Sequence, residues 1–81
     1  MWNYDEFRKG SFVEVLHSPA TMRWGVTVRS PMGEFVNVVY PPARGIVVDV
    51  FMDDLNQKYS MVLFHSGIAG HVYLNSLKLI G

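Results

Sequence analysis

Apolar and polar residues alternate along most of this chain, in short runs separated by turn residues. In residues 11–16, Val13 and Val15 fall on one face and Glu14 on the other, which is the period of a half-buried strand. No segment has a convincing helical period. Further runs of this kind predict strands at 23–29, 34–40, 45–52 and 59–64, and two short strands within 70–80 around a tight turn.

Turn-forming residues mark the breaks between these runs. Residues 17–20 contain Pro19, which cannot donate to a strand ladder, so the first strand ends there. Residues 30–33 combine a proline with a glycine and predict a hairpin between 23–29 and 34–40. The sequence therefore predicts one all-β domain over residues 11–81, preceded by an arm at residues 1–10.

The alternation also predicts which side chains form the core. The register of 45–50 stays open, because a bulge after Gly45 would place Val47 inside in place of Ile46. The expected core residues are Val13, Val15, Ile46, Val48, Val50, Val62, Phe64, Val72, Leu77 and Leu79.

Composition bears on the surface more than on the fold. Hydrophobic residues make up 49% of the 81 residues and charged residues 17%, against roughly 25% charged in an average domain. Seven Lys and Arg balance seven Asp and Glu, so the formal net charge is zero. A neutral chain with few charges favours self-association or a covered surface, and it disfavours sequence-independent binding to nucleic acid.

The chain has no cysteine, which excludes disulfides and thiolate metal sites. The first residues lack the apolar core of a secretory signal, and no apolar run is long enough to span a bilayer. We therefore expect a cytoplasmic location, with a virion as the second possibility if the chain is phage-encoded. His17, His65 and His71 have no carboxylate partner at a metal-ligand spacing, so we expect no metal and no cofactor.

Three segments carry a resemblance to a known architecture. Residues 9–16, 45–50 and 59–64 are similar to core strands of Src-homology-3-like barrels and of the related KOW-type modules, as found in short phage and bacterial proteins. The resemblance covers roughly residues 9–80. It implies a small five-stranded barrel with an extra hairpin in an enlarged first loop, residues 17–44.

The departures from this group concern its peptide groove. Peptide-binding members carry an Ala-Leu-Tyr-Asp-Tyr-like stretch that is missing here, and Tyr59 stands where they have a tryptophan. Tyr73 and Ser76 stand where their closing unit places a proline and a tyrosine. The resemblance therefore implies the barrel but not a groove for proline-rich peptides.

Large aromatic residues are the candidates for contact with a partner protein. Those of the arm either cover the open end of the barrel or dock on a neighbouring subunit. Together with the aromatics of the hairpin and the closing unit, they give the predicted protein-binding set: Trp2, Tyr4, Phe7, Trp24, Phe35, Tyr40 and Tyr73.

Three functions follow from these observations. The first is a non-enzymatic protein-binding or assembly module, such as a phage-encoded accessory or virion component, acting through the hairpin of residues 21–42 and the arm. The second is a KOW-like nucleic-acid or ribosome-associated module, in which arginine and aromatic residues would contact phosphates and bases. Its predicted contacts are Arg23, Arg29, Arg44 and Lys58.

The third function is an enzyme built from several copies. Type II dihydrofolate reductases are short chains with this barrel topology, and their closing strand carries a Val-Gln-Ile-Tyr stretch. The nearest equivalent here is residues 71–73, in which the glutamine is missing. The chain has no nucleophile elbow, phosphate loop or calcium loop, so we expect no enzymatic activity and no catalytic residue.

Overall fold

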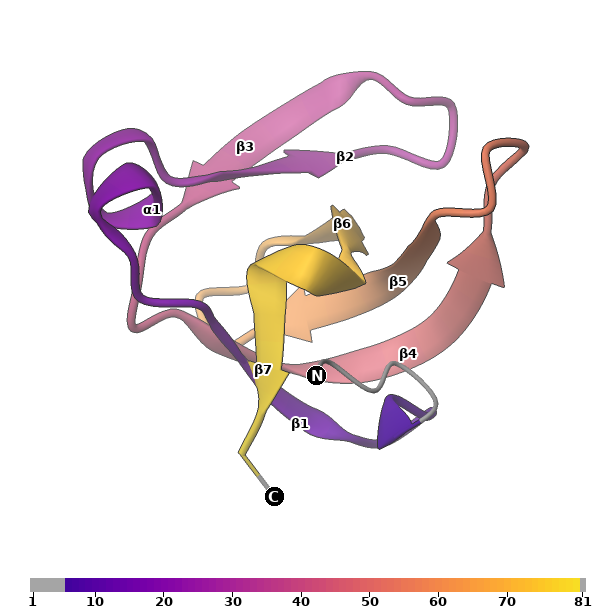
Figure 1. Ribbon diagram of the computed structural model, residues 1–81, viewed down its shortest axis with the longest axis horizontal. Coiled ribbons are helices and arrows are strands. Elements are labelled where there is room, and N and C mark those ends of the chain that lie inside the picture. Colours follow the sequence, from indigo (N-terminus) through magenta and orange to yellow (C-terminus); the bar gives the residue numbers. More distant parts are fainter. Residues whose placement is uncertain (1–5, 81) are drawn as a thin grey trace.

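The structure is a computed structural model, and it describes residues 6–80. Trp2 and Tyr4 therefore lie outside the described residues. Seven antiparallel strands form one sheet in the order β3-β2-β6-β5-β4-β1-β7 (Figure 1). The strands are β1 (Phe12–Val15), β2 (Val26–Arg29), β3 (Phe35–Val39), β4 (Arg44–Met52), β5 (Lys58–Phe64), β6 (Ala69–Tyr73) and β7 (Leu77–Leu79). Two short helices join them: α1 (Pro19–Trp24) and the 3₁₀ turn η2 (Leu74–Ser76).

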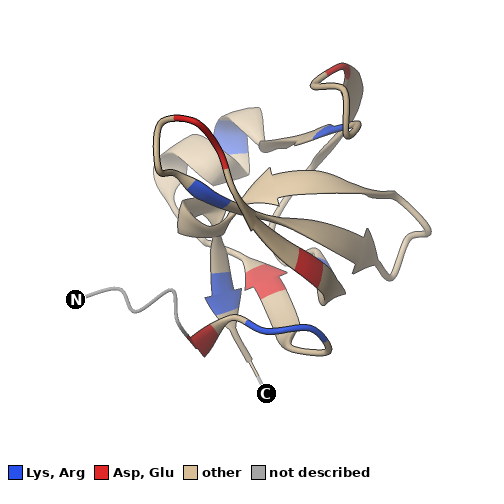
Figure 2. Ribbon diagram, turned by 90° about the vertical axis from the view of Figure 1, so that its right-hand side faces the viewer, with Lys and Arg blue, Asp and Glu red and all other residues tan. Residues whose placement is uncertain are grey.

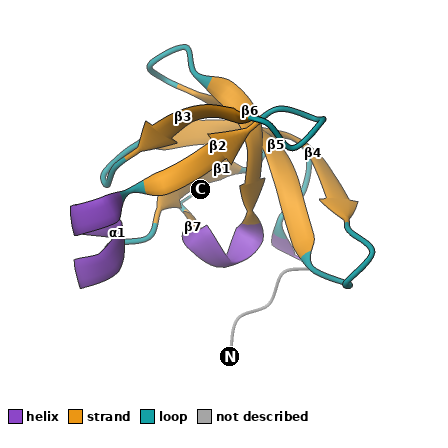
Figure 3. Cartoon of the chain, turned by 90° about the horizontal axis from the view of Figure 1, so that it is seen from above, coloured by secondary structure: helices purple, strands orange, loops and turns teal. Residues whose placement is uncertain are grey.

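The long strand β4 organises the sheet. Its first residues pair with β1, and nearly its whole length pairs with β5, which continues through a tight turn into β6. The last strand, β7, returns to pair with β1. The β2–β3 hairpin lies over this meander and is joined to it by one pair of facing residues, Arg29 of β2 and His71 of β6 (Figure 3).

The predicted all-β class is confirmed, but the closed five-stranded barrel is not. The sheet is open, with β3 and β7 at its two edges. The extra hairpin adds its two strands, β2 and β3, to this sheet, so all seven strands form one open sheet.

The predicted strand at 23–29 is wrong in its first residues, because α1 extends to Trp24. Ser18 caps this helix: its Oγ accepts a hydrogen bond from the Thr21 amide (3.1 Å), and the Thr21 hydroxyl accepts one from the Ser18 amide (2.9 Å). Such a reciprocal cap, followed by proline in the first turn, is a strong helix start. Gly25 ends the helix with φ near 73° and lets the chain turn into β2.

The predicted core is wrong at two positions of β4. A bulge between Val47 and Asp49 shifts the pairing with β5, so Val47 is buried while Ile46 and Val48 are 36% and 48% exposed. Val50 and Leu79 are partly buried against the core. The buried apolar residues are Phe7, Val13, Val15, Val26, Val28, Val39, Val47, Val62, Phe64, Val72, Leu74 and Leu77.

Gly70 sets how closely the hairpin approaches the rest of the sheet. A Cβ atom at this position would lie 2.6 Å from the Arg29 carbonyl oxygen and 2.6 Å from a methyl group of Val28. Any larger residue would therefore push β2 away from β6. Glycine at position 70 is what allows the hairpin to pack over the meander.

The outer face of β1 carries a nearly buried carboxylate. Glu14 faces Arg44 on one neighbouring strand and Lys78 on the other, and their nitrogens lie 3.8 and 3.6 Å from its oxygens. The His17 imidazole lies 3.6 Å from the same carboxylate. The Glu14 side chain is 8% exposed, so the surrounding cations take the place of its lost water.

Candidate functional site

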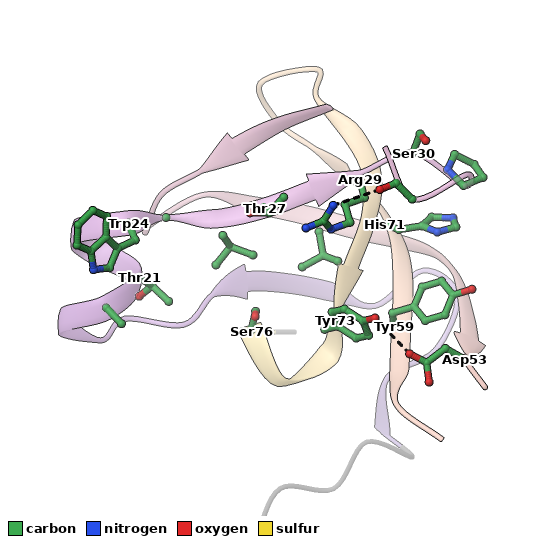
Figure 4. A pocket seen from close by; sticks show the side chains of 16 residues that line it. Thr21, Trp24, Thr27, Arg29, Ser30, Asp53, Tyr59, His71, Tyr73 and Ser76 are labelled. Atoms are coloured by element: carbon green, nitrogen blue, oxygen red, sulfur yellow. Dashed lines mark hydrogen bonds between the residues drawn. The ribbon is translucent and has the colours of Figure 1, made fainter. Parts of the chain in front are cut away.

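A groove with a volume of about 490 Å³ runs between the hairpin and the meander (Figure 4). One wall comes from α1, β2 and the turn at residues 30–33, and the other from β5, β6 and η2. The volume lies within the range of about 300–1,000 Å³ that is usual for ligand sites. The groove exists because the hairpin stands over the meander, so it is a product of the tertiary fold.

Aromatic side chains form the meander wall of the groove. Alternation along β6 turns Val72 into the core and leaves His71 and Tyr73 on the outer face, where Tyr59 of β5 is the direct neighbour of Tyr73. The Tyr59 ring centroid lies 5.0 Å from that of His71 and 5.9 Å from that of Tyr73. Phe51 of β4 stacks behind Tyr59 with centroids 5.3 Å apart. Packed rings of this kind give a firm, amphipathic contact surface.

Trp24 marks the opposite end of the groove. It is the last residue of α1 and is 69% exposed, which is a large apolar surface to leave in water. The guanidinium carbon of Arg23 lies 5.0 Å from the indole centroid, a cation–π contact. Figure 4 shows the indole at the far end of the groove from Tyr59 and Asp53.

Asp53 lies at the other end and accepts three hydrogen bonds. Its Oδ1 accepts hydrogen bonds from the amides of Leu55 and Gln57, both at 2.9 Å, which holds the turn at residues 53–57. Its Oδ2 accepts a hydrogen bond from the Tyr73 hydroxyl at 3.2 Å. This hydrogen bond, with the negative charge of Asp53, raises the pKa of Tyr73 above its ordinary value of 10.0.

The Tyr73 phenol is therefore expected to ionise later than a free tyrosine. Because the fold favours the neutral phenol, the stabilisation that this hydrogen bond gives is complete below pH 10 and is lost as the pH rises through the raised pKa. An alkaline titration of the tyrosine ring carbons by NMR, with the Tyr73 signal assigned from Tyr73→Phe, measures this. In Asp53→Asn the Tyr73 pKa should fall towards 10; an unchanged pKa in that variant would contradict the assigned cause.

Arg29 lines the groove and has N–H groups that make no hydrogen bond described within the chain. One of its terminal nitrogens donates to the Gly33 carbonyl oxygen at 3.1 Å, which orients the side chain from β2. The guanidinium group has five N–H donors, so one such bond leaves most of them for a ligand. Both oxygens of Asp53, in contrast, already accept hydrogen bonds within the chain.

The five predicted protein-binding residues that the structure describes divide into three groups. Trp24 and Tyr73 line the groove. Phe35 and Tyr40 are 64% and 52% exposed, but they belong to β3 and its end and do not line the groove. Phe7 is 5% exposed and packs into the core, so its ring is not available to a partner in this structure.

The four predicted nucleic-acid contacts are not gathered in one place. Arg29 lines the groove, whereas Arg44 is held by Glu14 on the outer face of the sheet. Arg23 lies on α1 beside Trp24, and Lys58 begins β5. Figure 2 shows basic and acidic positions interspersed along the ribbon.

The sequence did not predict that three further residues would line the groove together: Asp53, Tyr59 and His71. Tyr59 and His71 were visible as members of strands, but their proximity depends on the pairing of β5 with β6. The acidic turn after β4 carries no sign in the sequence of its contact with Tyr73, because that contact depends on the fold. The usable signal was the outward alternation of large rings on two neighbouring strands.

No protein-family description, curated protein or solved structure matches this chain at a significant level. Among residues 6–80, no helix is long and apolar enough to cross a membrane. The same residues hold no group of three or more His, Cys, Asp or Glu side chains placed to bind a metal ion. The candidate site therefore rests on the geometry of the groove.

Proposed function

We propose that this chain is a non-enzymatic protein-binding module whose groove takes an extended segment of a partner chain. The observation that carries the proposal is the groove itself, lined by Trp24 at one end and by Tyr59, His71 and Tyr73 at the other. Tryptophan, tyrosine and arginine are the residues that most often dominate the energy of protein interfaces. A segment that lies in a groove between two walls buries both of its sides.

The order of the elements supports the finer reading of the fold. The enlarged loop with α1, β2 and β3 follows β1, the meander β4–β5–β6 follows it, and η2 leads to β7, which pairs with β1. This is the order expected for a Src-homology-3-like chain. Tyr73 and Ser76, at the positions that line the groove in peptide-binding members, also line the groove here. The rings differ from those of such members, so we do not assign a proline-rich ligand.

The charges favour a protein partner over nucleic acid. Of the four candidate cations, Arg29 alone lines the groove, and Arg44 is engaged with Glu14. Binding to a phosphate backbone needs several cations on one surface, and affinity then falls steeply with salt. We expect the affinity for a partner to change only modestly between low and high salt.

Selection of extended peptides from a random library tests the function. We expect the chain to retain peptides whose affinity falls on the order of 30-fold in Trp24→Ala, because a truncated hot-spot ring costs about 2 kcal/mol. Phe35→Ala is the matched control, since Phe35 and Trp24 are similarly exposed, at 64% and 69%, and Phe35 lies outside the groove. Failure to retain any peptide, or equal losses in both variants, would count against the groove as the binding site.

A further inference from the structure

The groove contains a charged group, the Arg29 guanidinium, with N–H donors that a ligand could use. Arg29 has N–H groups to spare, whereas the Asp53 carboxylate already accepts bonds from the amides of Leu55 and Gln57 and from the Tyr73 hydroxyl. A ligand carboxylate is the strongest partner for the Arg29 donors, because a guanidinium group and a carboxylate form charge-assisted hydrogen bonds. The ligand's apolar or aromatic side chains would lie against Trp24 and the ring wall of β5 and β6.

The first residues of this chain have the required chemistry. Trp2 and Tyr4 are two positions apart, so in an extended segment they project to the same side. Asp5 and Glu6 follow them and carry two carboxylates. The side chain of Phe7, which follows this segment, is buried in its own chain.

We propose that the groove binds residues 1–6 of a second copy of the chain, with the acidic pair facing Arg29 and the two aromatic rings in the groove. The assignment of this partner rests on the proposed function. Fully extended, residues 1–5 span at most about 17 Å, so the exchange requires two copies whose grooves lie close together. Zero net charge removes the repulsion that would otherwise oppose the pairing.

The mass of the full chain, measured by light scattering from low micromolar to millimolar concentration, tests this proposal. We expect the mass of two copies at high concentration. Arg29→Glu should weaken the association at least about tenfold, because it places like charges together. Arg8→Glu is the matched control: it makes the same charge change at an exposed residue outside the groove. It should leave the association unchanged.

A charge exchange separates a specific contact from a loss of folding. Arg29→Glu combined with Asp5→Lys and Glu6→Lys restores the opposite charges and should restore the mass of two copies. A synthetic peptide of residues 1–6 with an amidated end should compete and return the wild-type chain to the mass of one copy. Association that is insensitive to Arg29→Glu overturns the proposal, as does a triple variant that remains a single copy.

The failure of this proposal can be told from failure of the proposed function. A mass of one copy at every concentration overturns the proposal of exchange between two copies. That result would also be seen if residues 1–6 occupied the groove of their own chain. If the peptide library still yields ligands that depend on Trp24, the groove remains a protein-binding site with a different partner. If the library yields none, the proposed function itself fails.

Discussion

Replacing Gly70 with alanine is expected to lower the free energy of unfolding by about 3 kcal/mol, at the upper end of the cost of overpacking. The added Cβ would meet the Arg29 carbonyl oxygen at 2.6 Å, and a backbone atom cannot rotate away as a side chain can. The strain can be relieved by moving β2 away from β6, which would also separate the two walls of the groove. Urea denaturation measures the loss of stability.

Gly67→Ala is the control for this prediction. Gly67 lies in the turn of the same β5–β6 hairpin and has nothing within 4 Å of an added Cβ, but its φ is 92°. Its cost should be the strain of a positive φ alone, about 1 kcal/mol. Gly70→Ala should in addition lower the protection of the β2 amides from hydrogen exchange. Equal stability of the two variants would show that the approach of β2 to β6 does not depend on a glycine.

Removing the cations around Glu14 is expected to give the second large effect. Arg44→Met combined with Lys78→Met leaves the nearly buried carboxylate with His17 as its remaining neighbour among the ion pairs described. We expect a loss of about 2 kcal/mol, which lies below the usual cost of an unpaired buried charge because both cations are about half exposed and screened by solvent.

Adding Glu14→Gln to that double variant should recover most of the lost stability, because the charge that lacks partners is then gone while the shape of the side chain is kept. Arg8→Met with Arg23→Met controls for the change in net charge, since neither cation contacts Glu14. Thermal unfolding compares the four proteins. If the variant with Glu14→Gln is no more stable than the double variant, the unpaired charge of Glu14 does not destabilise the protein, and the prediction is wrong.

The strands were predictable because each is a short run of alternating or continuous apolar residues bounded by turn residues. The helix α1 was missed for a physical reason: one and a half turns are too short to show a helical period. Its signal was local instead, in the serine, proline and threonine of residues 18–21, whose side chains and ring cap the first turn. Because apolar and polar residues also alternate at 23–25, the predicted strand begins too early and includes the last residues of the helix.

The bulge in β4 could not be read from the residues. Ile46, Val47 and Val48 are all apolar, so neither face of the strand is marked as polar, and the register depends on how β4 fits against β5. The sequence allowed a bulge after Gly45, whereas in the structure the bulge lies after Val47. Apolar runs without polar markers leave this choice to tertiary packing.

The candidate site was predictable in part. Trp24 and Tyr73 stand out as large exposed rings and do line the groove, whereas Phe35 and Tyr40 stand out equally and do not. Sequence marks a ring as exposed or buried by its place in the alternation. Whether an exposed ring meets others depends on which strands become neighbours, and here that rests on the pairing of β6 with β5 and on the contact that Gly70 permits.

The pairing of β1 with β7 has a consequence for the order in which the chain folds. The meander β4–β5–β6 makes contacts between segments close in sequence and can form early, whereas β1 pairs with β4 and gains its second neighbour only when the last strand arrives. The hairpin that forms the other wall of the groove lies between β1 and β4. The part of the groove wall that η2 supplies leads directly into β7, so it is fixed in place only when β7 pairs with β1.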